Sequence, residues 1–239
     1  MNKNLEFLKN PIIAHRGMHN IALGIPENSL AAFELAIEND YTIELDLHIL
    51  KDNQVVVFHD DNLKRMTGID RNIKDVTYDE IKDLKLQNTN YHIPLFEEVL
   101  KLINNKVAIL IELKTDVKHH RLEKMTASIL KNYDGIYAIQ SFSHSSIYWF
   151  KKNEPSIVRG RLSSASNREN ILNSLIDLFT QPDFLSYEIF SLPNKLVTNY
   201  RTNHLVLGWT IKNQEDLCKA IKYCDNYICE NISDLSFRP

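Results

Sequence analysis

Residues 41–60 read YTIELDLHILKDNQVVVFHD, and this stretch decides the fold. From Tyr41 to Leu47 the residues alternate, so a strand here places Glu44 and Asp46 on one face and the leucines on the other. Two carboxylates on the same face repel each other unless a cation lies between them. The stretch therefore predicts a strand that carries two carboxylates of a cation site.

A second apolar run, Val55 to Phe58, follows the first strand after a link of only four residues, Lys51 to Gln54. Such a link is too short for the crossover between parallel strands, but it suits a hairpin. We therefore expect the second run to return antiparallel to the first. The hairpin would bring His59 and Asp60 back towards Glu44 and Asp46.

Strand-like runs and helical patterns alternate along the rest of the chain, which is typical of a parallel sheet. Including the hairpin, nine runs are strand-like: Ile12–Ala14, Tyr41–Leu47, Val55–Phe58, Val107–Leu113, Ile136–Ser141, Ile157–Leu162, Phe184–Tyr187, Leu205–Thr210 and Tyr227–Glu230. Helical patterns include Ser29–Glu38, Leu95–Ile103 and His120–Lys131. Without the antiparallel return, eight parallel strands remain. We predict an α/β fold, a (β/α)8 TIM barrel.

A polar stretch of about residues 61–94 interrupts the alternation and contains one modest helical pattern near Tyr78–Leu86. It is predicted to be a small insertion after the strand 2 hairpin, above the barrel, and a candidate cap for the site. The sequence shows no internal repeat and no linker, with only 6 glycines in the chain. We therefore expect residues 1–239 to form a single TIM-barrel domain.

Composition limits the partners of this protein. The chain has 239 residues, 44% of them hydrophobic, and a net charge of −3 without a basic block, so no nucleic-acid partner is predicted. It contains no apolar stretch of the roughly 18 residues that a membrane span needs, and no apolar leader. We expect a cytoplasmic protein without stable membrane insertion. The three cysteines, near the end, lack metal-site spacing and are expected to be free thiols.

The carboxyl ends of barrel strands converge on one pocket, and here they carry ionisable groups. These candidate site residues are His15, Glu44, Asp46, Glu112, Lys114 and Trp209. Alternation places Glu112 and Lys114 on one face of their strand, so a third carboxylate reaches the centre. Three carboxylates suit one hard divalent cation, Mg²⁺ or Ca²⁺, better than zinc. We predict Glu44, Asp46 and Glu112 as its ligands.

The remaining groups fit a phosphodiester. The planar fork of Arg16 and the point charge of Lys114 suit phosphate oxygens, and His15 and His59 are left to move protons. Trp209 is a further candidate for substrate binding. Taken singly, a histidine at a strand end is usually structural, and acidic pairs on strands are commonly solvated. Within a sheet covered by helices, however, such groups are costly unless they face a functional cavity.

Seven motifs together resemble those of the glycerophosphodiester phosphodiesterases, in matching order over nearly the whole chain. They are His15-Arg16-Gly17, Pro26-Glu27-Asn28-Ser29, Glu44-Leu45-Asp46, His59-Asp60, Glu112-Leu113-Lys114, Gln140-Ser141-Phe142 and Trp209-Thr210. The resemblance implies a phosphatidylinositol-phospholipase-C-like barrel that hydrolyses small glycerophosphodiesters to sn-glycerol 3-phosphate and an alcohol. It implies metal ligation by Glu44, Asp46 and Glu112, with His15 and His59 as the acid–base pair.

The chain departs from the family pattern at three places. Leu50 stands where the family usually has threonine, Asp52-Asn53 where it has a glycine turn, and Cys229-Glu230 where it has Thr-Asp. None of these departures removes a catalytic group, so head-group preference is the property they affect most.

Two other functions stay open. One is a phospholipase D-like or lysophospholipase D activity on lipid substrates, which needs an exposed apolar mouth. The other is a non-catalytic protein that binds phosphodiesters. The sequence indicates neither the oligomeric state nor which metal is preferred.

Overall fold

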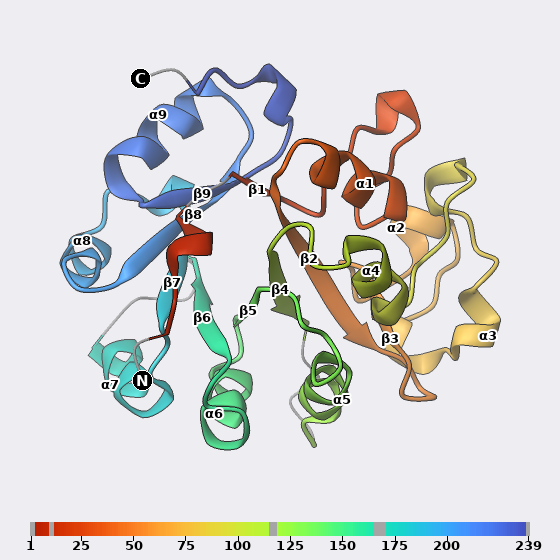
Figure 1. Ribbon diagram of the computed structural model, residues 1–239, viewed down its shortest axis with the longest axis horizontal. Helices are drawn as coiled ribbons and strands as arrows, with labels where there is room; N and C mark the ends of the chain where they lie inside the picture. Colours follow the sequence, from red (N-terminus) through yellow and green to blue (C-terminus); the bar gives the residue numbers. More distant parts are fainter. Residues whose placement is uncertain (1–2, 10–11, 115–118, 165–170, 238–239) are drawn as a thin grey trace.

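The computed structural model describes residues 3–9, 12–114, 119–164 and 171–237. Eight parallel strands form a closed ring in the order β1, β9, β8, β7, β6, β5, β4, β2, and β1 pairs with β2 to close it. Their bounds are β1 Ile13–Ala14, β2 Thr42–Ile49, β4 Ile109–Leu113, β5 Tyr137–Ser141, β6 Val158–Ser163, β7 Phe184–Glu188, β8 Leu205–Ile211 and β9 Asn226–Cys229. Helices surround the strands (Figure 1). The predicted (β/α)8 TIM barrel is confirmed.

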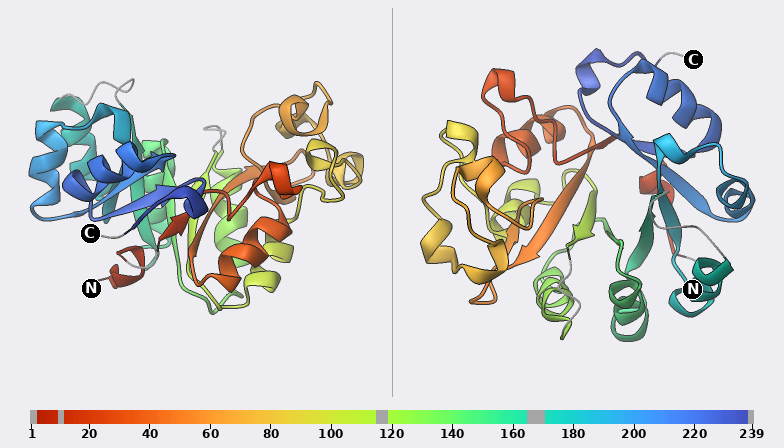
Figure 2. Two further views of the ribbon diagram at one scale, coloured as in Figure 1. Left: turned by 90° about the horizontal axis from the view of Figure 1, so that it is seen from above. Right: turned by 180° about the vertical axis from the view of Figure 1, so that it is seen from behind.

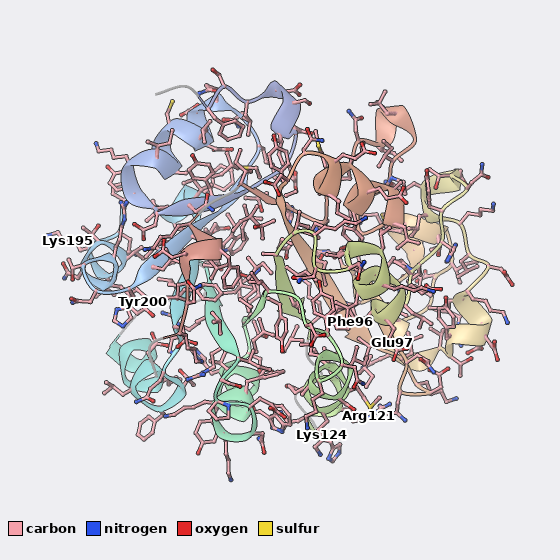
Figure 3. All side chains as sticks on the ribbon, in the orientation of Figure 1. Phe96, Glu97, Arg121, Lys124, Lys195 and Tyr200 are labelled. Atoms are coloured by element: carbon pink, nitrogen blue, oxygen red, sulfur yellow. The ribbon has the colours of Figure 1, made fainter. Side chains whose placement is uncertain are left out.

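The predicted hairpin is also present. β3 (Val55–Val57) runs antiparallel to β2, with Val57 opposite Leu47 and Val55 opposite Ile49. Arg121, labelled in Figure 3, holds the turn between the two strands. It donates to the side chain of Asn53 at 2.7 Å and to the carbonyl of Leu50 at 3.0 Å. The ninth strand-like run therefore lies outside the parallel ring, as its short link requires.

The outer helices follow the strands in alternation. They are α1 Leu30–Glu38, α4 Phe96–Ile103, α5 Arg121–Leu130, α6 His144–Asn153, α7 Ile171–Thr180, α8 Lys195–Arg201 and α9 Gln214–Tyr223. The predicted helix from Ser29 begins one residue later, because Ser29 is the N-cap and its hydroxyl accepts from the amide of Ala32. In the part of the chain that the structure describes, no helix is both long and apolar enough to cross a bilayer.

The end of the barrel where the parallel strands begin is filled by apolar side chains. The short helix η1 (Glu6–Leu8), red in Figure 1, inserts Leu8, which is completely buried against barrel residues such as Ile13, Leu110 and Phe184. The carbonyl of Leu8 also accepts from the side chain of Asn226 at 2.9 Å. Because this end is packed with apolar groups, the opposite end, where the strands terminate, is left for chemistry.

The segment of residues 61–94 stands beside β3 at one side of the molecule, orange to yellow in Figures 1 and 2. It contains α2 Lys64–Thr67, η3 Ile73–Asp75, α3 Tyr78–Ile81 and η4 Leu86–Asn88. Its apolar residues form a cluster of their own with Leu50, Val56 and Phe58. The helix expected over Tyr78–Leu86 is wrong beyond Ile81, because Leu86 donates to the carbonyl of Tyr91 and closes a loop.

Candidate active site

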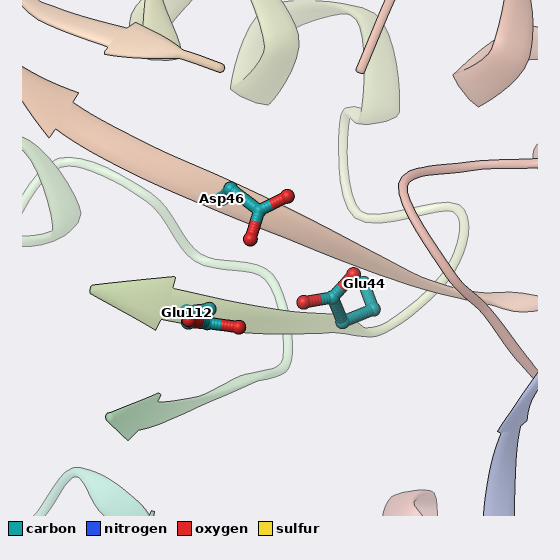
Figure 4. Close-up of side chains that lie close together, drawn as sticks. All are labelled: Glu44, Asp46 and Glu112. Atoms are coloured by element: carbon teal, nitrogen blue, oxygen red, sulfur yellow. The ribbon is translucent and has the colours of Figure 1, made fainter. Parts of the chain in front are cut away.

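Three buried carboxylates meet towards the carboxyl ends of two neighbouring strands. Glu44 and Asp46 lie on β2 and Glu112 on β4, where Asp46 and Glu112 are direct partners in register. Figure 4 shows the three side chains turned towards one another. One oxygen from each lies within 4.8 Å of the others, and the residues are 1%, 0% and 6% exposed. The structure therefore brings the predicted ligand set together.

The electrostatics of these carboxylates favour a cation. Burial, together with the charges of Asp46 and Glu112, raises the pKa of Glu44 well above its usual range. Burial also raises the pKa of Glu112, although Lys114 acts against this. For Asp46 the effect of burial is outweighed by Lys114 and Arg16, which hold its pKa below the usual range. Three ionised carboxylates at this spacing fit a hard divalent ion, which would relieve their repulsion.

Two cationic side chains flank the carboxylates. Lys114 forms ion pairs with Glu112 and, at 3.1 Å, with Asp46. The guanidinium of Arg16 lies 3.4 Å from Asp46 and donates to Glu27 at 2.8 Å. Both cations line the same cavity as Glu44 and Glu112. They are therefore placed where a bound anion would meet them.

The loop after β1 positions Arg16 through an unusual backbone. Arg16 and Gly17 both have positive φ values, +56° and +77°. A Cβ on Gly17 would lie 2.8 Å from the backbone carbon of Ala32 on α1, so only glycine fits there. The carbonyl of Arg16 accepts from the amide of Asn28, whose side chain donates to Asp46 at 2.8 Å. The motifs His15-Arg16-Gly17 and Pro26-Glu27-Asn28-Ser29 thus pack together against β2, which carries Glu44 and Asp46.

His15 is held by the last strand of the barrel. Its amide donates to the carbonyl of Cys229 on β9, and its Nδ1 lies 2.7 Å from Oε1 of Glu230. Burial raises the pKa of Glu230, but the hydrogen bond from His15 and nearby positive charges outweigh this effect. The resulting pKa is about 2. An ionised Glu230 can only accept a hydrogen bond, so Nδ1 of His15 carries the proton. Nε2 carries none and lies 3.9 Å from Oε2 of Glu44. Burial lowers the pKa of His15, despite Glu230.

His59 has a similar arrangement at the end of β3. The amide of Phe58 donates to the carbonyl of Asp46 at 2.9 Å, which brings His59 to the acidic strand. Its Nδ1 lies 2.7 Å from Oδ1 of Asp60, and burial lowers its pKa. His48 on β2 donates from Nε2 to the carbonyl of His59 at 3.1 Å. His48 therefore supports the backbone of His59.

One cavity collects most of the predicted site residues. Its lining is His15, Arg16, Glu44, His59, Glu112, Lys114, Gln140, Phe142, Leu162, Trp209, Thr210 and Ile228. Trp209 packs edge-on against Phe142, with ring centroids 5.7 Å apart, and these rings form an apolar wall. The described segment of residues 61–94 contributes no residue to this lining, and its expected role as a cap stays a prediction. Its own apolar cluster holds it beside β3.

The sequence interpretation missed several residues that contact the predicted ones. They are Glu27, Asn28, Asp60, Gln140, Phe142 and Glu230. All but Glu230 stand inside the quoted motifs, so a signal was present, but no role followed from it. Glu230 was noted only as a departure from the family pattern. Its contact with His15 depends on the pairing of β1 with β9, which joins the two ends of the chain.

Comparisons with known proteins agree with this site. The glycerophosphoryl diester phosphodiesterase family matches residues 15–232. The glycerophosphodiester phosphodiesterase of Caldanaerobacter subterraneus subsp. tengcongensis is 31% identical over 228 residues, 90% of this chain and 91% of that protein. Lysophospholipase D GDPD1 of Homo sapiens is 38% identical over 135 residues, 51% of this chain and 41% of that protein.

A solved structure gives the same architecture. The phosphodiesterase of Oleispira antarctica, in complex with its product sn-glycerol-3-phosphate, superposes with a TM-score of 0.82 at 23% identity, covering 92% of each chain. At this identity the likeness concerns the fold. The match of the family over residues 15–232 covers nearly the whole chain and all seven motifs. The chain is therefore an enzyme of the glycerophosphoryl diester phosphodiesterase family.

Proposed function

We propose that this enzyme hydrolyses glycerophosphodiesters to sn-glycerol 3-phosphate and an alcohol, with one divalent cation and two histidines. The observation that carries the proposal is that His15, His59, Arg16 and Lys114 line the same cavity as Glu44 and Glu112, two of the three clustered carboxylates. Carboxylates, cations and imidazoles together meet the needs of phosphodiester cleavage, because the reaction moves protons at two oxygens and gathers negative charge on the phosphate.

Glu44, Asp46 and Glu112 would hold the cation, Mg²⁺ or Ca²⁺. Their buried oxygens lie close enough to share one ion. When bound, such an ion acts as a Lewis acid on phosphate oxygens. Asn28 donates to Asp46, and the amide of Arg16 donates to Glu44 at 3.1 Å, so the direction of both carboxylates is fixed before an ion arrives. This support is the pre-orientation that ligands of a tight site need.

His15 and His59 would form the acid–base pair. Each keeps the proton on Nδ1 for a carboxylate and is neutral because burial lowers its pKa, so each can use Nε2 for proton transfer. One histidine would take the proton from the glycerol hydroxyl or from water. The other, after taking a proton from solvent on Nε2, would give that proton to the departing alcohol oxygen.

Arg16 and Lys114 would bind the phosphodiester oxygens, and Trp209 would contact the apolar part of the substrate. The two cations line the cavity beside the carboxylates, and Trp209 lines it together with Phe142. Charged groups on one wall and aromatic rings on another suit a ligand with a phosphate and a short carbon chain.

The test is product formation from a substrate panel. Purified enzyme is incubated with glycerophosphocholine, glycerophosphoethanolamine and glycerophosphoglycerol, with Mg²⁺, Ca²⁺ or a chelator, and glycerol 3-phosphate is measured. We expect release that requires the cation. Glu97→Gln, on the exposed side of α4, serves as the matched control for Glu112→Gln, which should lower the apparent affinity for the ion. Release that continues unchanged in chelator would contradict the metal assignment.

Lysophospholipids are the second substrate class in the panel. One observation favours them: Phe142, which lines the cavity, is 39% exposed and gives the mouth an apolar edge. Turnover of lysophosphatidylcholine without turnover of the glycerophosphodiesters would replace the first proposal by a lysophospholipase D activity. Cation-dependent binding of glycerophosphocholine without any turnover would indicate a non-catalytic binding protein.

A further inference from the structure

An arginine outside the cavity joins two carboxylates that support the site. Arg65 lies on α2, in the segment of residues 61–94, and faces Asp60 and Glu27. Its Nε donates to Oδ2 of Asp60 at 2.6 Å and its NH2 to Oδ1 at 3.0 Å. The same guanidinium donates to both oxygens of Glu27, at 2.7 and 3.0 Å. Arg65 thus binds both oxygens of each carboxylate.

Each of these two carboxylates also holds a cavity residue. Asp60 accepts from Nδ1 of His59 at 2.7 Å. Glu27 accepts from Arg16 at 2.8 Å through Oε1, the same oxygen that accepts from Arg65. The positions of His59 and Arg16 therefore depend on two carboxylates that share one guanidinium.

We propose that Arg65 is a positioning residue for the hydrolytic reaction. It fixes Asp60 and Glu27, and through them it sets the direction of His59 and of Arg16 in the cavity. The proposal rests on the roles given to His59 and Arg16 under the proposed function. It also gives the segment of residues 61–94 a role that requires no cap, since one of its side chains acts from behind the cavity wall.

Guanidinium geometry makes arginine specific for this place. A planar fork with five donors can bind two carboxylates side on, whereas the ammonium of lysine is a point charge that cannot fix the planes of both. Without Arg65, Asp60 would be free to rotate away from Nδ1 of His59. Glu27 would then keep only Arg16 as a cationic partner among the contacts described for it.

The exposure of Arg65 separates a positioning role from a stabilising one. Its side chain is 44% exposed, and ion pairs at exposed sites usually add little to the free energy of unfolding. We therefore expect the loss of Arg65 to disturb the reaction much more than the fold. Arg71 provides a matched control, because it lies in the same segment, is 46% exposed and pairs with Glu80 at 2.9 Å, away from the site.

The experiment compares Arg65→Gln, Arg65→Lys and Arg65→Ala with Arg71→Gln, using glycerophosphocholine and the preferred cation. We expect kcat to fall on the order of 10–100-fold in all three Arg65 variants, because small misplacements of catalytic groups have effects of this size. The value of KM should rise as well, through Arg16. Melting temperatures should change by no more than about 4 °C, and Arg71→Gln should behave as the wild type.

Chemical rescue provides the readout that a purely structural role would not give. Guanidinium chloride at low millimolar concentration should restore part of kcat in Arg65→Ala, and none in His59→Ala. The inference is overturned if Arg65→Gln matches Arg71→Gln in kcat and KM while His59→Ala is inactive. If His59→Ala and Arg16→Gln both keep full activity, the proposed function fails instead, and this inference with it.

Discussion

The Nδ1 atom of His15 lies 2.7 Å from Oε1 of Glu230, although 215 residues separate them in the chain. This contact exists because β1 and β9 are neighbours in the closed barrel. Glu230 accepts a hydrogen bond from Nδ1–H and thereby fixes which nitrogen of His15 faces the cavity. A carboxylate that orients an imidazole in this way supports proton transfer without touching the substrate.

Replacing Glu230 with glutamine should lower kcat and leave KM nearly unchanged. A general acid or base contributes about 10²–10⁴-fold to a reaction, and a disturbed tautomer would forfeit part of this, on the order of 10-fold. The control is Lys212→Gln, because Lys212 is 53% exposed and pairs with Oε2 of Glu230 at 3.4 Å. Steady-state kinetics with glycerophosphocholine measure the effect. Equal kcat values for Glu230→Gln and the wild type would remove Glu230 from the account.

The carboxyls of Glu112 and Glu44 should stabilise the metal-free enzyme less as the pH rises. Burial raises the pKa of Glu112 from its ordinary value of 4.5 to about 7, and the pKa of Glu44 is raised well above the same value. At these two groups the folded state binds more protons than the unfolded state, so their contribution to the free energy of unfolding falls from about pH 4.5 to beyond pH 7. The lowered pKa values of His15 and His59 act in the opposite direction. Urea unfolding in a chelator at several pH values measures this slope.

A saturating cation should remove this contribution, because the ion keeps both carboxylates ionised. In chelator, the free energy of unfolding of Glu112→Gln should fall less with rising pH than that of the wild type, whereas Glu97→Gln should leave the slope unchanged. The pKa of Asp46 is lowered from its ordinary value of 3.8. Its effect on stability is therefore confined to pH values below about 4, outside the window from pH 4.5 to 7. Equal slopes for Glu112→Gln and the wild type in chelator would contradict the electrostatic interpretation of the three carboxylates.

Gly17→Ala should cost more stability than Gly24→Ala. Both glycines have positive φ values, +77° and +73°, so the backbone cost of alanine is comparable, about 1–2 kcal/mol. Only Gly17 adds a clash, because its Cβ would meet Ala32, while nothing lies within 4 Å of a Cβ on Gly24. Urea unfolding of both variants gives the difference. Equal free energies of unfolding would show that the loop after β1 can move to accommodate the Cβ without a loss of stability, which would contradict this prediction.

Trp209→Ala should raise KM about 10-fold with a smaller effect on kcat. Losing an aromatic contact of about 1–2 kcal/mol weakens binding by this factor. Tyr148→Ala is the control, since Tyr148 lies on α6, is 48% exposed and does not line the cavity. An unchanged KM for glycerophosphocholine, together with a raised KM for lysophosphatidylcholine, would instead assign the aromatic wall to a lipid chain.

The barrel could be predicted from the sequence because each strand is a short apolar run and the helices between them have clear periods. The hairpin was predictable from a physical limit, since four residues cannot form a crossover. The segment of residues 61–94 was less predictable. Its helices are single turns held by loop contacts, such as the one from Leu86 to Tyr91, which leave no period in the sequence.

The candidate site divides in the same way. The carboxylates of Glu44 and Asp46 follow from strand alternation, and the placement of Glu112 beside them follows from the parallel order of the barrel. Contacts between distant segments could not be derived, because they depend on side-chain directions after folding. The pair of His15 with Glu230 and the bridge of Arg65 between Glu27 and Asp60 are both of this kind.

The central claim is that His15 and His59 act as an acid–base pair, and leaving-group dependence tests it most directly. The measurement is kcat/KM of the wild type, His15→Ala and His59→Ala with two esters of glycerol 3-phosphate, one of choline and one of p-nitrophenol. We predict that both variants lose about 10²–10⁴-fold with the choline ester, and that one regains most of its rate with p-nitrophenol, which departs without a proton. A rate near the wild type in either variant with the choline ester would contradict the account.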